Sequence, residues 1–173
     1  QFNNDCDITG WLQSEKYFED CKEEIKKQFR FNLDTTKSIY KLLPKDYTKE
    51  IIAISIRRGD YVNNPNYALL PINYYIGALI KEFPDYHNYS IVIFSDDMEY
   101  CKLHFDCLPN VSYAEGTAIE QLCLMSLCDH FIIANSTFSW WGAWLGEKEH
   151  SKVIKPNYHF GYEFGKLNNA KDF

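Results

Sequence analysis

The sequence predicts a fold of the α/β class, with a parallel β-sheet that carries helices on both faces. Short runs rich in β-branched residues recur along the chain, and stretches with helical periodicity separate them. Mostly apolar runs indicate strands buried on both faces, and their alternation with helices is typical of a parallel, doubly wound sheet. The runs occupy residues 51–56 (IIAISI), 90–95 (SIVIFS), 130–134 (HFIIA) and 152–155 (KVIK), with a weaker candidate at 111–113 (VSY).

Two helices are expected before the first strand. Residues 13–31 alternate charged side chains with spaced apolar ones, a pattern that predicts one amphipathic helix. A second helix is expected over residues 34–43, because Asp34 is a suitable N-cap and Pro44 stops the helix. The helices between and after the strands are expected at residues 71–83, 97–104, 117–128 and 137–147.

Length and charge limit the classes of function. A chain of 173 residues fits one domain with a substantial core. A formal net charge of −6 and only short basic clusters argue against a nucleic-acid-binding protein, which would carry a basic patch. No apolar run reaches the ~18 residues that cross a bilayer, and no signal peptide opens the sequence.

The six cysteines indicate reduced thiols. They include no C-x-x-C pair, and no histidine lies at zinc-ligand spacing from a cysteine pair. Cys123 and Cys128 lie in apolar sequence, where a free cysteine commonly behaves as a small buried hydrophobe. We therefore expect a cytoplasmic protein, with peripheral association at the inner face of the membrane left open.

Polar residues cluster directly after three of the expected strands. The clusters are residues 57–60 (RRGD), 95–97 (SDD) and 135–139 (NSTFS). The carboxyl ends of parallel strands lie at one edge of a sheet, where ligands bind near helix N-termini. The sequence therefore predicts three ligand-binding loops on one rim.

Arginine is rare in this chain, which makes the pair Arg57 and Arg58 informative. Only three of the 18 basic residues are arginines, and two of them are adjacent at the end of a strand. The planar guanidinium fork suits bidentate phosphate contacts, and Gly59 lets the backbone approach a ligand closely. A surface pair, or a salt bridge to Asp60, is the alternative interpretation.

The other two loops offer complementary groups. One of Asp96 and Asp97 is expected to cap the following helix, while the other accepts hydrogen bonds from a base or ribose. Solvation of the second carboxylate is the alternative. Ser136 and Thr137, at a strand-to-helix turn, offer hydroxyl and backbone N–H donors to an anion.

Three tryptophans follow the third loop within five residues. On a helix Trp140 and Trp144 would share a face, while Trp141 would point away from them. Anchoring of the helix to the sheet is the expected role of at least two of these rings.

Three common ligand signatures are absent. The sequence contains no G-x-G-x-x-G, no G-x-x-x-x-G-K-[ST] and no D-x-D metal motif. If a diphosphate binds here, arginine side chains and helix N-termini must neutralise it. We therefore expect no metal site, and no cofactor apart from a nucleotide substrate.

These motifs resemble those of the α-1,2-fucosyltransferases, glycosyltransferase family 11. Residues 56–62 (IRRGDYV) are similar to a region shared by α-1,2-, α-1,6- and protein O-fucosyltransferases. Residues 94–97 (FSDD) and 135–145 (NSTFSWWGAWL) resemble later motifs of the α-1,2 group. The resemblance extends over residues 10–160, and three motifs in the same order make it specific.

The resemblance implies the Rossmann-like, donor-binding half of a GT-B glycosyltransferase. Residues 31–173 would form this domain, and residues 1–30 the tail of a missing acceptor domain or a linker helix. The implied reaction is inverting, metal-independent transfer of fucose from GDP-fucose to a galactoside hydroxyl in α-1,2 linkage, in bacterial carbohydrate metabolism. Arg57 and Arg58 would be catalytic. The implied donor-binding residues are Ser55, Arg57, Arg58, Asp60, Asp96, Asp97, Ser136, Thr137, Phe138 and Ser139.

Two departures from the family pattern leave alternatives open. Ser55 stands where the family has a histidine that helps to recognise guanine, which leaves base specificity open. Family members are longer and contain a Gly-rich acceptor-domain motif, so a nucleotide-sugar-binding fragment without turnover is the main alternative. An RGD adhesion module (residues 58–60) would need an exposed, mobile loop. Asp60 is expected to be structural, because a carboxylate beside two arginines is a weak base.

Overall fold

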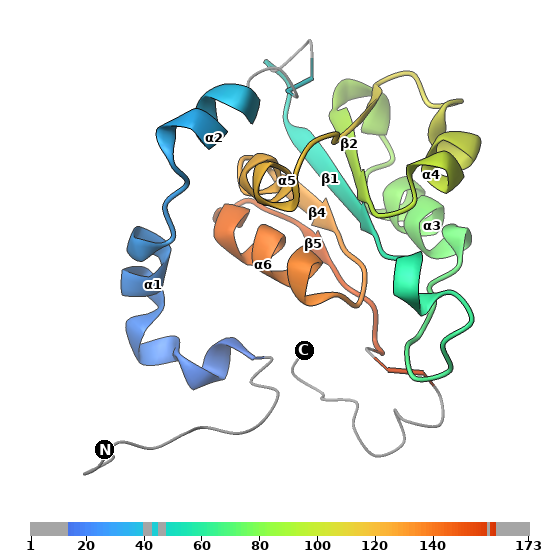
Figure 1. Ribbon diagram of the computed structural model, residues 1–173. Helices are drawn as coiled ribbons and strands as arrows, with labels where there is room; N and C mark the ends of the chain where they lie inside the picture. The colour runs from blue at the N-terminus through green and yellow to red at the C-terminus, as the bar shows by residue number, and fades with distance from the viewer. Residues whose placement is uncertain (1–13, 40–42, 45–47, 159, 162–173) are drawn as a thin grey trace. The chain divides into compact units, whose positions relative to one another are not determined.

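The centre of the structure is a five-stranded, fully parallel sheet in the order β3-β2-β1-β4-β5 (Figure 1). It is seen in a computed structural model that describes residues 14–39, 43–44, 48–158 and 160–161. The predicted fold class is confirmed, and the weaker candidate strand forms one edge of the sheet. The strands are β1 (Ile51–Ile56), β2 (Ser90–Ser95), β3 (Val111–Tyr113), β4 (His130–Ile132) and β5 (Val153–Ile154).

The strand order creates a switch point beside β1. The chain runs from β1 outward to β2 and β3, then returns to place β4 against the other side of β1. Ser55 of β1 lies opposite Phe94 of β2, and Ile54 lies opposite Ile132 of β4. In open α/β sheets a crevice forms at the carboxyl edge of the strands at such a switch point.

Helices cover both faces of the sheet, as expected from six consecutive buried residues in β1 (Figure 1). Ile52 and Ile54 pack in one cluster with Tyr75, whereas Ala53 packs in another with Leu124. Successive strand residues therefore point to opposite helical layers. One layer contains α3 (Ile72–Glu82) and α4 (Met98–Phe105), and the other contains α5 (Ala118–Met125) and α6 (Thr137–Gly146).

Side-chain caps fix the starts of α4 and α5. The carboxylate of Asp97 accepts a hydrogen bond from the Tyr100 N–H at 3.1 Å, so Asp97 is the cap that the sequence predicted in this loop. Thr117 and Glu120 form a capping box at the start of α5. These caps hold both helix starts at the carboxyl edge of the sheet.

The chain divides into two compact units, with the boundary between Arg30 and Phe31. The second unit contains the sheet and also α2 (Leu33–Ile39), in which Ser38 donates a hydrogen bond to the Glu120 carboxylate of α5. This bond ties the capping box of α5 to α2. The assignment of residues 1–30 to an acceptor domain stays a prediction.

The single helix predicted over residues 13–31 is wrong for the described part, residues 14–31. The structure has two 3-10 turns, Glu15–Tyr17 and Glu19–Cys21, followed by α1 (Lys22–Gln28). Phe18 leaves the helical region at φ −138° and ψ 23°, which separates the turns. None of these three elements buries a residue, so tertiary packing does not support a longer helix.

The predicted cap of α2 is also wrong. The Thr35 N–H donates to the side-chain oxygen of Asn32 at 2.7 Å, which places Asp34 inside the first turn. An amide oxygen before the helix competes successfully with a carboxylate two residues later. Most of the predicted C-terminal turn, at residues 40–42, lies outside the described residues.

No helix in the described ranges combines the length and the apolar character that crossing a bilayer requires.

Candidate functional site

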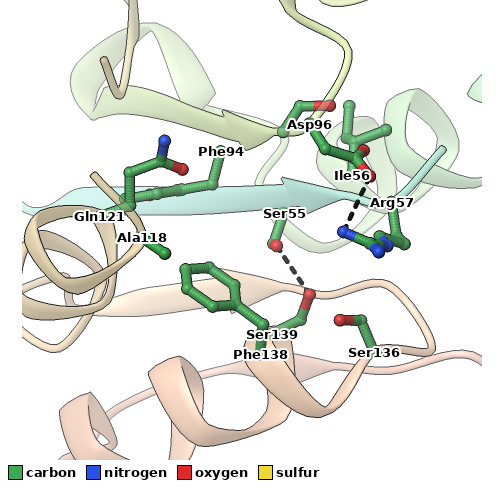
Figure 2. A pocket seen from close by; sticks show the side chains of 11 residues that line it. Ser55, Ile56, Arg57, Phe94, Asp96, Ala118, Gln121, Ser136, Phe138 and Ser139 are labelled. Carbon is green, nitrogen blue, oxygen red and sulfur yellow. Dashed lines mark hydrogen bonds and ion pairs between the residues drawn. The ribbon is translucent and has the colours of Figure 1, made fainter. Parts of the chain in front are cut away.

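A pocket of about 190 Å³ opens at the carboxyl edge of β1 and β2, beside the start of α6 (Figure 2). Its position is the switch-point edge at which the sequence predicted three ligand loops. All three loops contribute, together with two residues of α5. The lining residues are Ser55, Ile56, Arg57, Phe94, Ser95, Asp96, Ala118, Gln121, Ser136, Phe138 and Ser139.

The structure brings six of the ten predicted donor-site residues into this lining, namely Ser55, Arg57, Asp96, Ser136, Phe138 and Ser139. The other four, Arg58, Asp60, Asp97 and Thr137, do not line the pocket. Arg58, Asp60 and Asp97 instead contact the lining residues or one another, as described below. Thr137 is the exposed first residue of α6.

Arg57 reaches the pocket with its side chain about one-third exposed. Its guanidinium forms ion pairs with Asp60 at 2.6 Å and with Asp96 at 2.8 Å. The anticipated salt bridge to Asp60 is therefore present, and Asp96 adds a second partner (Figure 2). An incoming anion that binds this guanidinium must compete with two carboxylates.

Arg58 turns away from the pocket and is held on both sides. Its Nε donates to the Asp97 carboxylate at 3.0 Å, and its guanidinium carbon lies 3.5 Å from the centre of the Tyr100 ring. The hydrogen bond from Arg58, followed by that from the Tyr100 N–H, lowers the pKa of Asp97. Arg58 thus links the loop after β1 to the start of α4, and its side chain is only 18% exposed.

Asp96 is not the unengaged carboxylate that the sequence suggested. It accepts a hydrogen bond from the backbone N–H of Arg58 at 2.9 Å in addition to the ion pair with Arg57. Gly59 allows this approach, because a Cβ atom at position 59 would overlap the Asp96 carboxylate. The glycine expected to admit a ligand therefore admits the side chain of Asp96.

Ser55 occupies the floor of the pocket and is almost fully buried. Its hydroxyl shares a hydrogen bond of 2.7 Å with the hydroxyl of Ser139, which projects from α6 (Figure 2). This bond joins the central strand to the helix across the base of the pocket. Both hydroxyls can donate or accept, so they adapt to either kind of ligand group.

The loop after β4 presents the start of α6 to the pocket. Ser136 is the N-cap residue, and its side chain makes no capping hydrogen bond. The first backbone bond of α6 runs from the Trp140 N–H to the Ser136 carbonyl. The N–H groups of the first turn lie before this bond and point along the helix axis, where the macrodipole favours negative charge.

The three tryptophans of α6 form one cluster. Trp140 and Trp144 stack with their centres 6.0 Å apart, as their spacing predicted. Trp141 does not point away: its ring makes edge contacts with Trp140 at 5.0 Å and with Trp144 at 5.4 Å. The rings are large enough to contact one another, although their Cβ atoms leave the helix in different directions.

Sequence reasoning did not assign a role to five lining residues: Ile56, Phe94, Ser95, Ala118 and Gln121. Phe94 and Ser95 belong to a recognised motif, and their position next to Asp96 was an available signal. Ala118 and Gln121 come from α5, which has no motif of its own. Both lie in the first turn and a half of α5, directly after the capping box at Thr117.

Within the described part of the chain, no group of three or more His, Cys, Asp or Glu side chains is arranged to hold a metal ion. The charged residues that line the pocket are Arg57 and Asp96. The arrangement can hold an anion between the Arg57 guanidinium and the α6 N-terminus. Two aromatic rings, Phe94 and Phe138, add apolar surface beside these polar groups.

Sequence relatives of the chain are glycosyltransferases. An α-1,2-colitosyltransferase from Escherichia coli is 34% identical over 91% of this chain and 57% of its own length. The O-antigen biosynthesis glycosyltransferase WbnK from E. coli is 41% identical over 62% and 38%, respectively. Human galactoside α-(1,2)-fucosyltransferase 1 is 23% identical over 93% and 52%. The chain spans about half the length of the curated relatives it matches.

Solved fucosyltransferases share the fold. The α-1,6-fucosyltransferase NodZ, in crystals soaked with GDP-fucose, aligns with a TM-score of 0.52 at 13% identity, covering 73% of this chain and 47% of NodZ. POFUT1 in complex with GDP-fucose aligns with a TM-score of 0.50 at 16% identity, covering 76% and 48%. The likeness confirms the predicted fold class, a parallel α/β sheet with helices on both faces, and it covers about half of each of these two chains.

The description "Glycosyl transferase family 11" belongs to the family model that matches residues 6–171. This span includes all three loops of the pocket and the whole sheet. The colitosyltransferase, at 34% identity over 91% of this chain, supports the same assignment. The resemblance drawn from the sequence is thereby confirmed, and the chain belongs to glycosyl transferase family 11.

Proposed function

We propose that this chain binds GDP-fucose and forms the donor side of an inverting α-1,2-fucosyltransferase that acts on a galactoside hydroxyl. The observation that carries the proposal is the position of Arg57, whose partly exposed guanidinium lines the pocket together with the first turn of α6. A cation and a helix N-terminus in one pocket suit a diphosphate. The relatives named for α-1,2 transfer, and those solved with GDP-fucose, support this donor and this linkage.

The reaction would break the bond between the anomeric carbon of fucose and the diphosphate oxygen. The acceptor hydroxyl oxygen forms the new bond, its proton passes to a general base, and GDP leaves with the electron pair. Charge therefore builds on the departing diphosphate. Arg57 and the N–H groups of α6 would stabilise this charge, and one such donor typically contributes about 3–4 kcal/mol to the transition state.

Donor binding would exchange the two carboxylate partners of Arg57 for a diphosphate. When a diphosphate approaches, it would replace Asp96 and Asp60 on the guanidinium. Asp96 would then be released within the pocket, where its oxygens can accept N–H donors of a base. In this proposal Asp96 would hold Arg57 before the donor binds and would recognise the nucleoside once the donor is bound.

We also propose that the transfer needs no metal ion, because the arginine and helix N-terminus supply the positive charge. A cytoplasmic location is part of the same proposal. The general base is not among the residues assigned here: Asp60 is paired with Arg57 and lies outside the pocket lining.

Titration calorimetry of the wild-type chain with GDP, ADP and UDP tests the proposal. GDP should bind more tightly than the other two, with unchanged affinity in EDTA. If no nucleoside diphosphate binds, the donor site is not where we place it. Loss of GDP binding in EDTA would contradict the metal-independent part alone. GDP-fucose can be compared with activated colitose, since one relative transfers colitose.

A second candidate function is nucleotide-sugar binding without turnover. It is favoured by one observation: Asp96, the carboxylate that lines the pocket, is paired with Arg57, so the described lining holds no unengaged carboxylate to accept the proton of an acceptor hydroxyl. Incubation with GDP-fucose and a β-galactoside separates the two candidates. Fucosylated product supports the enzyme, whereas tight donor binding without product supports the binding fragment.

A further inference from the structure

Two hydrogen bonds join the loop after β1 to the loop before α6. The hydroxyl of Tyr61 donates to the backbone carbonyl of Asn135 at 2.8 Å. The side-chain amide of Asn135 donates in turn to the backbone carbonyl of Ala68 at 3.0 Å. Tyr61 and Asn135 are both buried, so water does not compete for these bonds.

The joined residues flank the pocket groups that are proposed to hold the diphosphate. Tyr61 ends the 3-10 turn that begins directly after Arg58, and the guanidinium carbon of Arg57 lies 5.6 Å from the centre of its ring. Asn135 precedes Ser136, the N-cap of α6. The bond from Tyr61 to Asn135 therefore connects the arginine side of the pocket to its helix side.

Tyr61 is itself held rigidly. Its ring stacks on Tyr67 with centres 4.3 Å apart and planes 7° apart, and Tyr67 pairs with Phe160 through an isolated antiparallel bridge. Burial raises the pKa of Tyr61 to about 12, so the hydroxyl keeps its proton and remains a donor at neutral pH. A buried, oriented donor of this kind fixes the separation of the groups it joins.

We propose that Tyr61 is a positioning residue for the donor diphosphate: its hydrogen bond to Asn135 sets the gap between Arg57 and the first turn of α6. The inference rests on the proposed function, since it requires a diphosphate in that gap. Tyr61 need not touch the nucleotide. A wider gap would prevent the two sides from contacting both phosphates at once, and misplacement on the scale of 1 Å strongly affects such sites.

Tyr74 provides a matched control. Its hydroxyl donates to the backbone carbonyl of Ile133 at 3.1 Å, so it also bonds to the segment after β4. Tyr74 lies on α3 and is not among the residues that line the pocket. The Tyr74 hydroxyl also lies 3.4 Å from the Ile154 carbonyl, so the two bonds are not identical, but Tyr61→Phe and Tyr74→Phe remove the same chemical group and both should lower the melting temperature.

The test is titration calorimetry of the full 173-residue chain with GDP and GMP, with melting temperatures alongside. Tyr61→Phe should weaken GDP binding roughly fivefold to tenfold, the equivalent of about one net hydrogen bond, and should weaken GMP binding less. Tyr74→Phe should leave both affinities unchanged. Asn135→Leu, which removes the donor to Ala68 without adding a charge, should repeat the selective loss for GDP and serves if Tyr61→Phe does not fold.

The possible results are distinguishable. Unchanged GDP affinity in Tyr61→Phe, or equal losses in Tyr61→Phe and Tyr74→Phe, would overturn the positioning role while leaving the donor site intact. Equal losses for GDP and GMP would likewise count against it. If the wild-type chain binds no GDP, the proposed function fails first, and this inference fails with it.

Discussion

The Arg57 guanidinium and the Asp96 carboxylate form an ion pair of 2.8 Å at the edge of the pocket. The pair joins the loops after β1 and β2, the two adjacent central strands. It places the cation expected to bind phosphate and the carboxylate expected to bind the nucleoside in direct contact. Any ligand that uses both must separate them, so both side chains should influence nucleotide affinity.

Arg57→Lys should weaken GDP binding roughly tenfold to a hundredfold. Lysine keeps the charge but cannot make two parallel N–H···O contacts, and each charge-assisted hydrogen bond contributes about 1.5–3 kcal/mol. The change is measured by GDP titration. Arg30→Lys is the control, because Arg30 is exposed and lies outside the sheet-containing unit.

Melting temperatures complete this experiment. Arg57 is partly exposed at the rim, so Arg57→Lys should change the stability little. A large drop in melting temperature with GDP binding preserved would mean that Arg57 serves only as a structural salt bridge to Asp60 and Asp96.

Asp96→Asn and Asp97→Asn should have different consequences. Asp96 lines the pocket, so Asp96→Asn should reduce the preference for GDP over ADP. Asp97 caps α4 and pairs with Arg58, and asparagine keeps the capping oxygen but loses the charge, so Asp97→Asn should lower the melting temperature only modestly, by the equivalent of less than about 1 kcal/mol for a lost exposed ion pair. If Asp97→Asn alone changes the base preference, the assignment of Asp96 to the nucleoside is wrong.

Glu120 should make folding stability depend on pH below about 4.3, the usual pKa of glutamate. The hydrogen bond from Ser38, followed by those from Thr117, lowers the pKa of Glu120 to about 2 in the folded protein. Because the pKa is lower in the folded state, the ionised carboxylate stabilises the fold at any pH above its pKa in the unfolded state. This contribution is lost as the pH falls towards 2, the pKa in the folded state. Urea unfolding of wild type and Glu120→Gln from pH 6 to about pH 2.5 should show the two curves converge.

Glu149→Gln is the control for this measurement, because Glu149 is exposed and has no hydrogen bond in the described structure. Its stability curve should run parallel to that of the wild type. If the stability curve of Glu120→Gln also runs parallel to that of the wild type, ionisation of Glu120 does not contribute to the folding stability.

The strands of this fold could be predicted because a strand that is buried on both faces consists almost entirely of apolar residues. Ile51–Ile56 and Ser90–Ser95 are nearly continuous apolar runs, and their predicted bounds match the structure. The first helix could not be predicted in the same way. Its apolar spacing is real, but no part of it is buried, so nothing holds residues 15–28 in one continuous helix.

The sequence predicted the pocket residues that directly follow a strand. It did not predict the residues whose direction depends on a side chain from another segment. Arg57 and Arg58 are adjacent and chemically identical, yet Asp97 and Tyr100 draw Arg58 out of the pocket. Gln121 enters the pocket from a helix whose start depends on a capping box. The direction of Arg58 and the position of Gln121 depend on contacts between segments that are distant in the sequence, and the local spacing of residues does not predict such contacts.

Ser55 and Ser139 should behave as one unit in a double-mutant cycle. Their hydroxyls share a hydrogen bond of 2.7 Å in a buried place, with exposures of 4% and 1%. Ser55→Ala or Ser139→Ala alone leaves the other hydroxyl without this partner, at a cost of about 1–3 kcal/mol. The double variant removes both polar groups, so its loss of stability should be smaller than the sum of the single losses, by about 1 kcal/mol or more.

Urea unfolding of the wild type, the two single variants and the double variant measures this coupling. Ser112 provides the control. It lies on β3, which β2 separates from β1, and its hydroxyl donates to the Ile91 carbonyl of β2. Ser55→Ala combined with Ser112→Ala should be additive, because distant sites without shared partners do not couple. Additive losses for the Ser55 and Ser139 pair would mean that the bond across the pocket floor does not hold β1 to α6. GDP titration of the same variants tests whether the pair also matters for binding: a loss of affinity larger in the double variant than in either single variant would mean that both hydroxyls support the nucleotide site.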